Sequence, residues 1–252
     1  MLCRGGDDRI ICVMKYIDVH CHLQNADNIG ATLNAAQSVG VCGAICNATA
    51  PDDWAQVRQI ACEYKSVRGA IGVHPWRIHD LSGDVWARDM YDILRDNPDL
   101  MIGECGLDKF HPDMSQQLNV FNTQLQMAAE LGRPVFIHCV GAWDKMFQIL
   151  KSRKSHLPMI MVAHAFNGSA EILTRLINEY NFYISASPMI LDNRRTRLLD
   201  AMRGAPINRI LIESDGTNPA DVISVAGRVA DIKNVAQSEI ADIIYKNTIG
   251  IL

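Results

Sequence analysis

The chain has 252 residues, a length at which α/β barrels routinely form one domain with a full core. Its 24 Lys and Arg residues against 28 Asp and Glu residues give a formal net charge of −4. This balance excludes an overall basic surface for binding nucleic acid, so any contact with phosphate must be local. No apolar run approaches the roughly 20 residues that a membrane span requires.

The N-terminal residues 1–14 are expected to form a disordered extension in front of a barrel domain over 15–252. They lack the apolar core of a signal peptide, and Met14 is itself a candidate start. The eight cysteines include no Cys-x-x-Cys pair, which disfavours a cysteine zinc site. Their positions favour reduced thiols and a cytoplasmic compartment, because four lie in or beside apolar strand-like runs: Cys42, Cys46, Cys105 and Cys139.

Short apolar strands recur along the chain, and each is followed by an amphipathic, helix-like stretch. The predicted strands are Tyr16–His20, Val41–Cys46, Val67–Val73, Leu100–Glu104, Pro134–His138, Pro158–His164, Phe182–Ser187 and Arg209–Glu213. The predicted helices are Asn28–Val39, Asp52–Tyr64, Gly83–Asp96, Asp113–Leu131, Ala142–Ser152, Ser169–Tyr180, Asn193–Met202, Pro219–Val229 and Ser238–Ile249. Eight alternating units predict a closed (β/α)8 TIM-type barrel. An open, doubly wound sheet would need a glycine-rich phosphate turn after an early strand, and none is present.

Imidazoles and carboxylates gather at the carboxyl ends of these strands, where barrel enzymes have their active sites. His20 and His22 are two residues apart at the end of the first strand, so their side chains point the same way. Nitrogen and oxygen ligands without thiolate suit zinc, manganese, nickel or magnesium. The sequence predicts that one or two divalent ions bind at this rim, where His74 also lies, through His20, His22, Glu104, His138, His164 and Asp215.

Taken singly, these residues also have ordinary structural interpretations. Glu104 could lie in a surface turn, and Asp215 could cap a helix N-terminus. His138 and His164 could be core histidines with satisfied hydrogen bonds. Their convergence at one rim favours the metal site.

Six motifs follow one another at barrel spacing. They are Asp18-Val19-His20-Cys21-His22-Leu23, Gly72-Val73-His74-Pro75, Ile102-Gly103-Glu104-Cys105-Gly106-Leu107-Asp108, Pro134-Val135-Phe136-Ile137-His138, His164-Ala165-Phe166-Asn167-Gly168-Ser169 and Leu211-Ile212-Glu213-Ser214-Asp215. In this order the chain resembles the TatD-related metal-dependent deoxyribonucleases, from about residue 15 to the C-terminus. The helix before the fifth strand also fits, through Gln117, Phe121, Gln124 and Leu125.

The resemblance implies phosphodiester hydrolysis by a metal-activated water, with Asp215 and Glu104 as catalytic residues. Asp215 would orient or deprotonate the water, and His74 would contact substrate. The implied ligand sets are His20, His22 and Asp215 on one ion, His138 and His164 on the other, and Glu104 bridging the two.

The residues around the rim depart from the family's usual pattern. Cys139-Val140-Gly141 stands where the family usually has Ser-Arg-Asp, so the arginine, a natural phosphate contact, is missing. Gly216-Thr217 replaces Ser-Pro after Asp215, and Ala165 replaces a cysteine. The chemistry is therefore better predicted than the substrate.

Other rim residues are expected to hold substrate instead, although each cation taken singly would be an ordinary solvated charge. The expected substrate contacts are His74, Arg77, Asp108, Lys109, Arg194 and Arg195.

The leading functional hypothesis is a deoxyribonuclease or exonuclease acting on DNA that is single-stranded or bound by its end. The alternative is an amidohydrolase-type enzyme that cleaves a small-molecule amide or ester. The acidic charge and the missing arginine favour this alternative, whereas Glu104 and the ordered motifs oppose it. A non-enzymatic scaffold is disfavoured because no ligand is missing. The sequence leaves the metal and the oligomeric state open.

Overall fold

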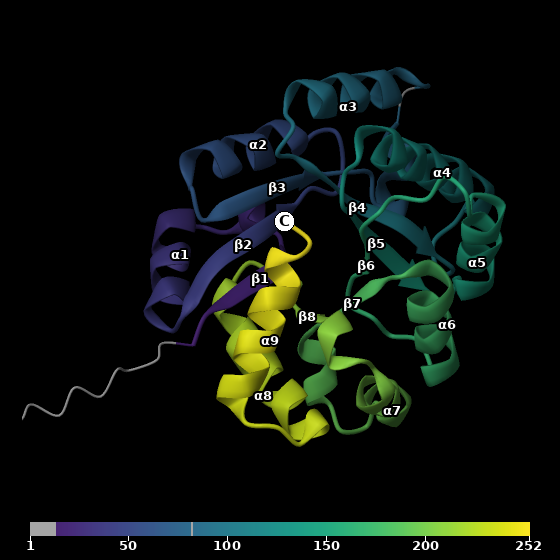
Figure 1. Ribbon diagram of the computed structural model, residues 1–252. Helices are drawn as coiled ribbons and strands as arrows, with labels where there is room; N and C mark the ends of the chain where they lie inside the picture. Colours follow the sequence, from purple (N-terminus) through teal and green to yellow (C-terminus); the bar gives the residue numbers. More distant parts are fainter. Residues whose placement is uncertain (1–13, 82) are drawn as a thin grey trace, which may run out of the picture.

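The computed structural model describes residues 14–81 and 83–252. The expected extension over 1–14 therefore lies outside the described residues, apart from Met14. Within them, eight parallel strands form one sheet in which each strand neighbours the next along the chain. The α-helices surround this ring of strands (Figure 1). The single-domain TIM-type barrel predicted from the sequence is confirmed.

The strands and helices follow one another in the predicted order. The strands are β1 (Tyr16–Cys21), β2 (Val41–Asn47), β3 (Val67–Ile71), β4 (Met101–Asp108), β5 (Val135–Val140), β6 (Met161–Ala163), β7 (Tyr183–Ala186) and β8 (Ile210–Ile212). The α-helices of the described chain are α1 (Ile29–Ser38), α2 (Trp54–Glu63), α3 (Val85–Asp96), α4 (Met114–Leu131), α5 (Trp143–Ser152), α6 (Ala170–Tyr180), α7 (Thr196–Gly204), α8 (Val222–Lys233) and α9 (Gln237–Ile249).

Two strand boundaries differ most from the sequence prediction. β4 continues past Glu104 to Asp108, because this extension pairs in parallel with the end of β5. β6 is shorter than the predicted Pro158–His164, since Pro158 has no N–H to donate inside a closed sheet. His164 therefore stands just beyond the end of its strand.

The amino ends of the strands are closed by the C-terminal segment. Asn247 of α9 donates hydrogen bonds to the carbonyl oxygens of Ile207 and Ile210, at 2.9 and 2.8 Å. In Figure 1, α9 lies over β1 and β8, and its end brings the C-terminus to the middle of the ring. The apolar layer inside the barrel includes one residue from this segment, and its members are Val19, Ile45, Ala70, Met101, Phe136, Val162, Leu211 and Ile251. Chemistry is thus left to the carboxyl ends.

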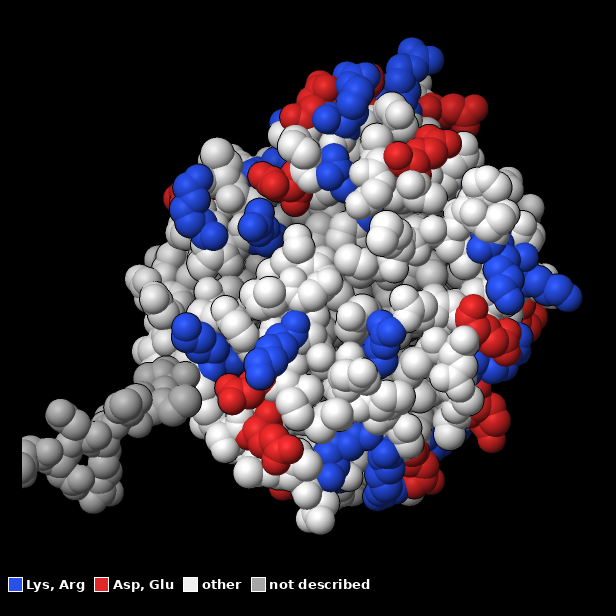
Figure 2. All heavy atoms as spheres, in the orientation of Figure 1, with Lys and Arg blue, Asp and Glu red and all other residues white. Residues whose placement is uncertain are grey.

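The face that carries the C-terminus has no broad area of one charge in its described part. Figure 2 shows acidic and basic side chains intermixed there. An extended basic surface is therefore absent from this face, in keeping with the overall charge of −4. No described helix combines the length and the apolar character needed to cross a bilayer.

The cysteines behave largely as expected. Those in the described residues are free, and Cys46, Cys105 and Cys139 are buried as small apolar side chains. Cys42 is exposed, because this residue of β2 points away from the core.

Candidate metal centre at the carboxyl ends of the strands

The barrel closes where the ends of β1 and β8 meet. The buried Asp18 carboxylate accepts hydrogen bonds from the backbone N–H of His20 (3.1 Å) and from the N–H and hydroxyl of Ser214 (3.0 and 2.5 Å). Asp215 N then donates to His20 O (3.0 Å). These bonds fix both strand ends, so His20, His22 and Asp215 face the same mouth.

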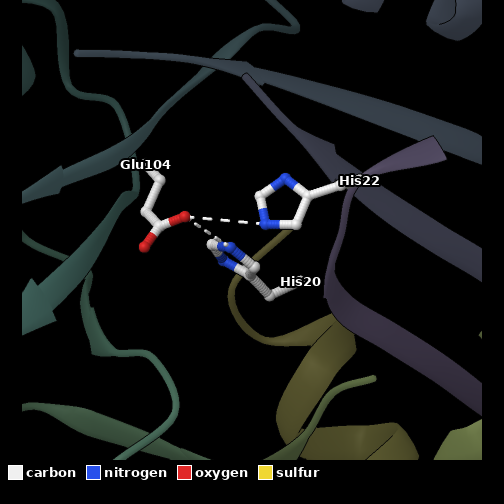
Figure 3. Close-up of side chains that lie close together, drawn as sticks. All are labelled: His20, His22 and Glu104. Atoms are coloured by element: carbon white, nitrogen blue, oxygen red, sulfur yellow. Dashed lines mark hydrogen bonds and ion pairs between the residues drawn. The ribbon is translucent and has the colours of Figure 1, made fainter. Parts of the chain in front are cut away.

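Glu104 of β4 lies buried at the centre of the cluster. Its Oε2 is 3.2 Å from His20 Nε2 and 3.7 Å from His22 Nε2, and Figure 3 shows these three side chains converging. Its Oε1 is 2.7 Å from His164 Nε2 and 2.9 Å from His138 Nδ1. Burial opposes ionisation of Glu104, but the surrounding imidazoles, His164 foremost, hold its pKa well below the usual range. The two oxygens therefore serve two sets of imidazoles.

Two of these imidazoles have an outer nitrogen bonded to an acceptor. His22 Nδ1 lies 2.9 Å from the carbonyl oxygen of Asn47, so Nδ1 carries the proton. His164 Nδ1 lies 3.3 Å from Glu213 Oε1. In the neutral rings each Nε2 turns a lone pair toward the Glu104 carboxylate, which places acceptor against acceptor. A positive charge between the Glu104 oxygens and these nitrogens would therefore relieve the repulsion of their lone pairs.

The shifted pKa of His164 also indicates that this cluster favours positive charge. Burial lowers it, but Glu104 and Glu213 outweigh burial and hold the pKa well above its usual value. His138 brings its Nδ1 within 3.3 Å of His164 Nε2. The outer Nε2 of His138 has no hydrogen-bond partner in the described chain and lies 3.5 Å from Asp108 Oδ2.

The donor atoms suit a divalent ion. Three groups place one ligand atom per residue within 4.8 Å of one another: His20, His22 and Glu104; His20, His164 and Glu213; and His74, Glu104 and His138. Asp215 belongs to none of these groups within the described residues. Its Oδ1 lies 3.8 Å from His22 Nε2, at the more exposed edge of the cluster. Nitrogen and oxygen donors without thiolate fit zinc, manganese, nickel or magnesium.

His74 differs from His22 in its protonation. Its Nδ1 accepts a hydrogen bond from Trp76 N (3.1 Å), so a neutral ring carries its proton on Nε2. That Nε2 lies 3.1 Å from Glu104 Oε1. His74 therefore presents a donor to the mouth, where His22 presents a lone pair.

Glu213 belongs to the site but received no role in the sequence analysis. It is fully buried and accepts hydrogen bonds from Ala165 N (2.6 Å) and the Ser185 hydroxyl as well as facing His164. A carboxylate behind an imidazole fixes the ring and its tautomer. The available signal was an acidic residue at the very end of a predicted apolar strand.

The expected substrate contacts are distributed unevenly around the mouth. Its cavity of 330 Å³ is lined by His22, Thr49, His74, Trp76, Arg77, Glu104, His138, His164 and Asp215. Arg77 is engaged by Asp52 (2.9 Å) and Asp80. The exposed Lys109, Arg194 and Arg195 lie outside this lining. Trp76 lines it without having been predicted.

Asp108 and Lys109 are held at the junction of β4 and β5. The buried Asp108 carboxylate accepts hydrogen bonds from Trp76 Nε1 (2.7 Å) and Phe110 N (2.8 Å). Lys109 N donates to Val140 O (2.9 Å), and a Cβ at Gly141 would lie 3.2 Å from Lys109 Cβ. Gly141 thus leaves room for the lysine stem.

Comparison with known proteins gives consistent results. The family model described as TatD related DNase matches residues 17–252. The chain is 32% identical over 188 residues to the 3'-5' ssDNA/RNA exonuclease TatD of Klebsiella pneumoniae (strain 342), covering 71% of this chain and 68% of that protein. It is 27% identical over 255 residues to the uncharacterized metal-dependent hydrolase YjjV of Escherichia coli (strain K12), covering 94% and 97%. The crystal structure of YjjV, a TatD homolog, superimposes with a TM-score of 0.88 at 26% identity, covering 95% of this chain and 98% of that one.

Proposed function

The chain belongs to the TatD-related DNase family, and from that premise we propose that it is a metal-dependent hydrolase that trims single-stranded DNA by cleaving phosphodiester bonds. The carrying observation is the Glu104 carboxylate, which faces the lone pairs of His22 and His164. The relatives named a 3'-5' ssDNA/RNA exonuclease and a metal-dependent hydrolase support both parts of the proposal.

The residues that would hold one or two divalent ions are His20, His22, Glu104, His138, His164 and Asp215. Ions bound there supply Lewis acidity, which lowers the pKa of water and neutralises charge on phosphoryl oxygens.

The side chains of the cluster divide the remaining work. Glu104 keeps its two oxygens on the two imidazole sets and so fixes their spacing. Asp215, at the open edge, orients the attacking water and accepts its proton. His74 donates from Nε2 to a phosphate oxygen. Glu213 holds the His164 ring in place from behind.

The lining of the cavity supports a second candidate function, the hydrolysis of small amides or esters. The cavity measures 330 Å³, near the lower end of the range for small-molecule sites. Arg77 is the cation in its described lining, and Asp52 and Asp80 already engage it.

A direct comparison of substrates separates the two. Protein loaded in parallel with zinc, manganese, magnesium or nickel is given 5'-labelled single-stranded DNA, the matched duplex, and a panel of amides and esters. We expect progressive shortening of the single strand, abolished by chelator. Asp215→Asn should lower that rate by at least about 10²-fold, without changing the thermal unfolding of metal-free protein. Turnover of an amide or ester with no cleavage of DNA would replace the nuclease by the small-molecule hydrolase.

A further inference from the structure

Trp76 is an exposed aromatic ring at the mouth of the candidate metal centre. It is 54% exposed and lines the cavity beside His74 and Glu104. By contrast, Trp54 and Trp86 are buried at 3% and 8% exposure. A large aromatic ring that is exposed to water beside the predicted metal ligands is suited to pack against a flat, apolar group of a bound molecule.

The ring is held in one orientation. Its Nε1 donates to Asp108 Oδ2 (2.7 Å), and one face stacks on His111 with centroids 4.5 Å apart and planes 19° apart. It stands perpendicular to the His74 ring, with centroids 5.0 Å apart. Its other aromatic neighbours within residues 14–81 and 83–252, His74 and His138, are T-shaped to it rather than stacked on it. Trp76 thus offers a flat surface whose rotamer is already fixed.

This surface lies within one side chain of the predicted ligands. The Trp76 and His138 rings have centroids 6.3 Å apart, and His74 lies between Trp76 and the Glu104 carboxylate. A group bound at the cluster and extending sideways would therefore meet the indole face. The heterocyclic base of a nucleotide is flat and apolar enough to stack there.

We propose that Trp76 is a base-stacking platform, which holds the nucleobase of a nucleotide whose phosphate lies at the Glu104 cluster. The proposal rests on the proposed function and specifies how that site binds its substrate. Stacking tolerates every base, since each has a π-face.

Asp108 acts in this scheme as a positioning residue. Its oxygens hold Trp76 Nε1 and Phe110 N, and its residue is only 3% exposed. Burial opposes its ionisation, but the nearby His138 imidazole and the hydrogen bonds from Trp76 and Phe110 outweigh burial and hold its pKa below the usual range. The ionised Asp108 carboxylate thereby holds the indole ring in its orientation at the mouth.

The test removes the base from the substrate and the ring from the protein. Single-stranded oligonucleotides carry a tetrahydrofuran abasic residue at the first, second or third position from the 3' end, and each is compared with the intact strand. For the wild type, one abasic position should lower kcat/KM by about 5- to 100-fold, the range given by base–aromatic stacking. The loss should appear in KM, because stacking forms before the chemical step.

Three variants assign that loss to the indole. Trp76→Ala should cleave intact and abasic strands equally well, at the rate of the wild type on the abasic strand. Trp76→Phe should keep most of the discrimination, because phenylalanine retains a flat ring. Trp143→Phe is the matched control, since Trp143 packs on Phe166 outside the cavity lining. It should discriminate as the wild type does. Metal content is measured in every variant and should not change.

Two results would overturn the inference alone, and a third would overturn it together with the proposed function. Equal cleavage of intact and abasic strands by the wild type at all three positions would remove base stacking while the nuclease function stands. Discrimination that survives in Trp76→Ala would place the stacking surface elsewhere. Failure of the metal-loaded wild type to cleave any strand would overturn the proposed function, and this inference with it.

Discussion

Glu213 shows how a buried carboxylate can act on a metal site through another residue. It faces His164 Nδ1 and is itself held by Ala165 N and the Ser185 hydroxyl. Glu213→Gln keeps the volume but removes the charge that fixes the tautomer. We expect divalent-metal affinity to fall by about 10- to 100-fold, measured by competition with a chromogenic chelator.

The control for this variant is Glu130→Gln, an exposed change on α4. It should leave metal affinity unaltered. An affinity equally unaltered in Glu213→Gln would show that Glu213 contributes only to packing.

At the scale of single residues, the sequence could place the six predicted ligands at one mouth, because position at a strand end decides it. His22 and His74 could not be told apart in that way. Their proton positions depend on Asn47 O and Trp76 N, which are contacts that chain order does not reveal. The exposure of Trp76 is likewise a tertiary property.

At the scale of elements, α4 fixes the ends of the strands that carry the site. Gln124 binds both backbone groups of Val73, accepting from N (2.8 Å) and donating to O (3.1 Å). Gln117 binds Asp108 in the same way, at 2.8 and 3.0 Å. Both glutamines are fully buried. These side chains take the place of ladder bonds just where His74 and Asp108 must be held.

Gln124→Leu should therefore destabilise the fold by about 2–4 kcal/mol, because it leaves two buried backbone groups of Val73 unpaired. The free energy of unfolding in urea measures this loss. Gln126→Leu changes an exposed residue of the same helix and is the matched control. Equal urea midpoints for the two variants would refute this role of Gln124.

The sequence predicted α4 almost to the residue, since its apolar spacing is a local signal. The end of β4 was predicted at Glu104, but the strand runs to Asp108. Pairing of Cys105 with Ile137 and of Asp108 with Val140 decides that end, and such pairing depends on a strand far along the chain.

At the scale of the molecule, the two ends of the barrel have different tasks. Ile251 joins the apolar layer inside the barrel from the C-terminal side, and the amino ends of the strands are closed. The opposite end gathers polar side chains around a 330 Å³ cavity. Eight βα units predicted this convergence from topology alone. The closing role of Ile251 was not predicted, because one apolar residue after a helix carries no pattern.

Anomalous scattering from crystals grown with manganese or zinc tests the central claim most directly, namely that the imidazoles around Glu104 hold divalent metal. We predict one or two anomalous peaks in contact with Glu104, at roughly 2.0–2.2 Å from its oxygens and from the facing imidazole nitrogens. The peaks should lie among His20, His22, His138 and His164. Crystals that bind the ion only elsewhere, or in which these imidazoles turn away from Glu104, would contradict the account.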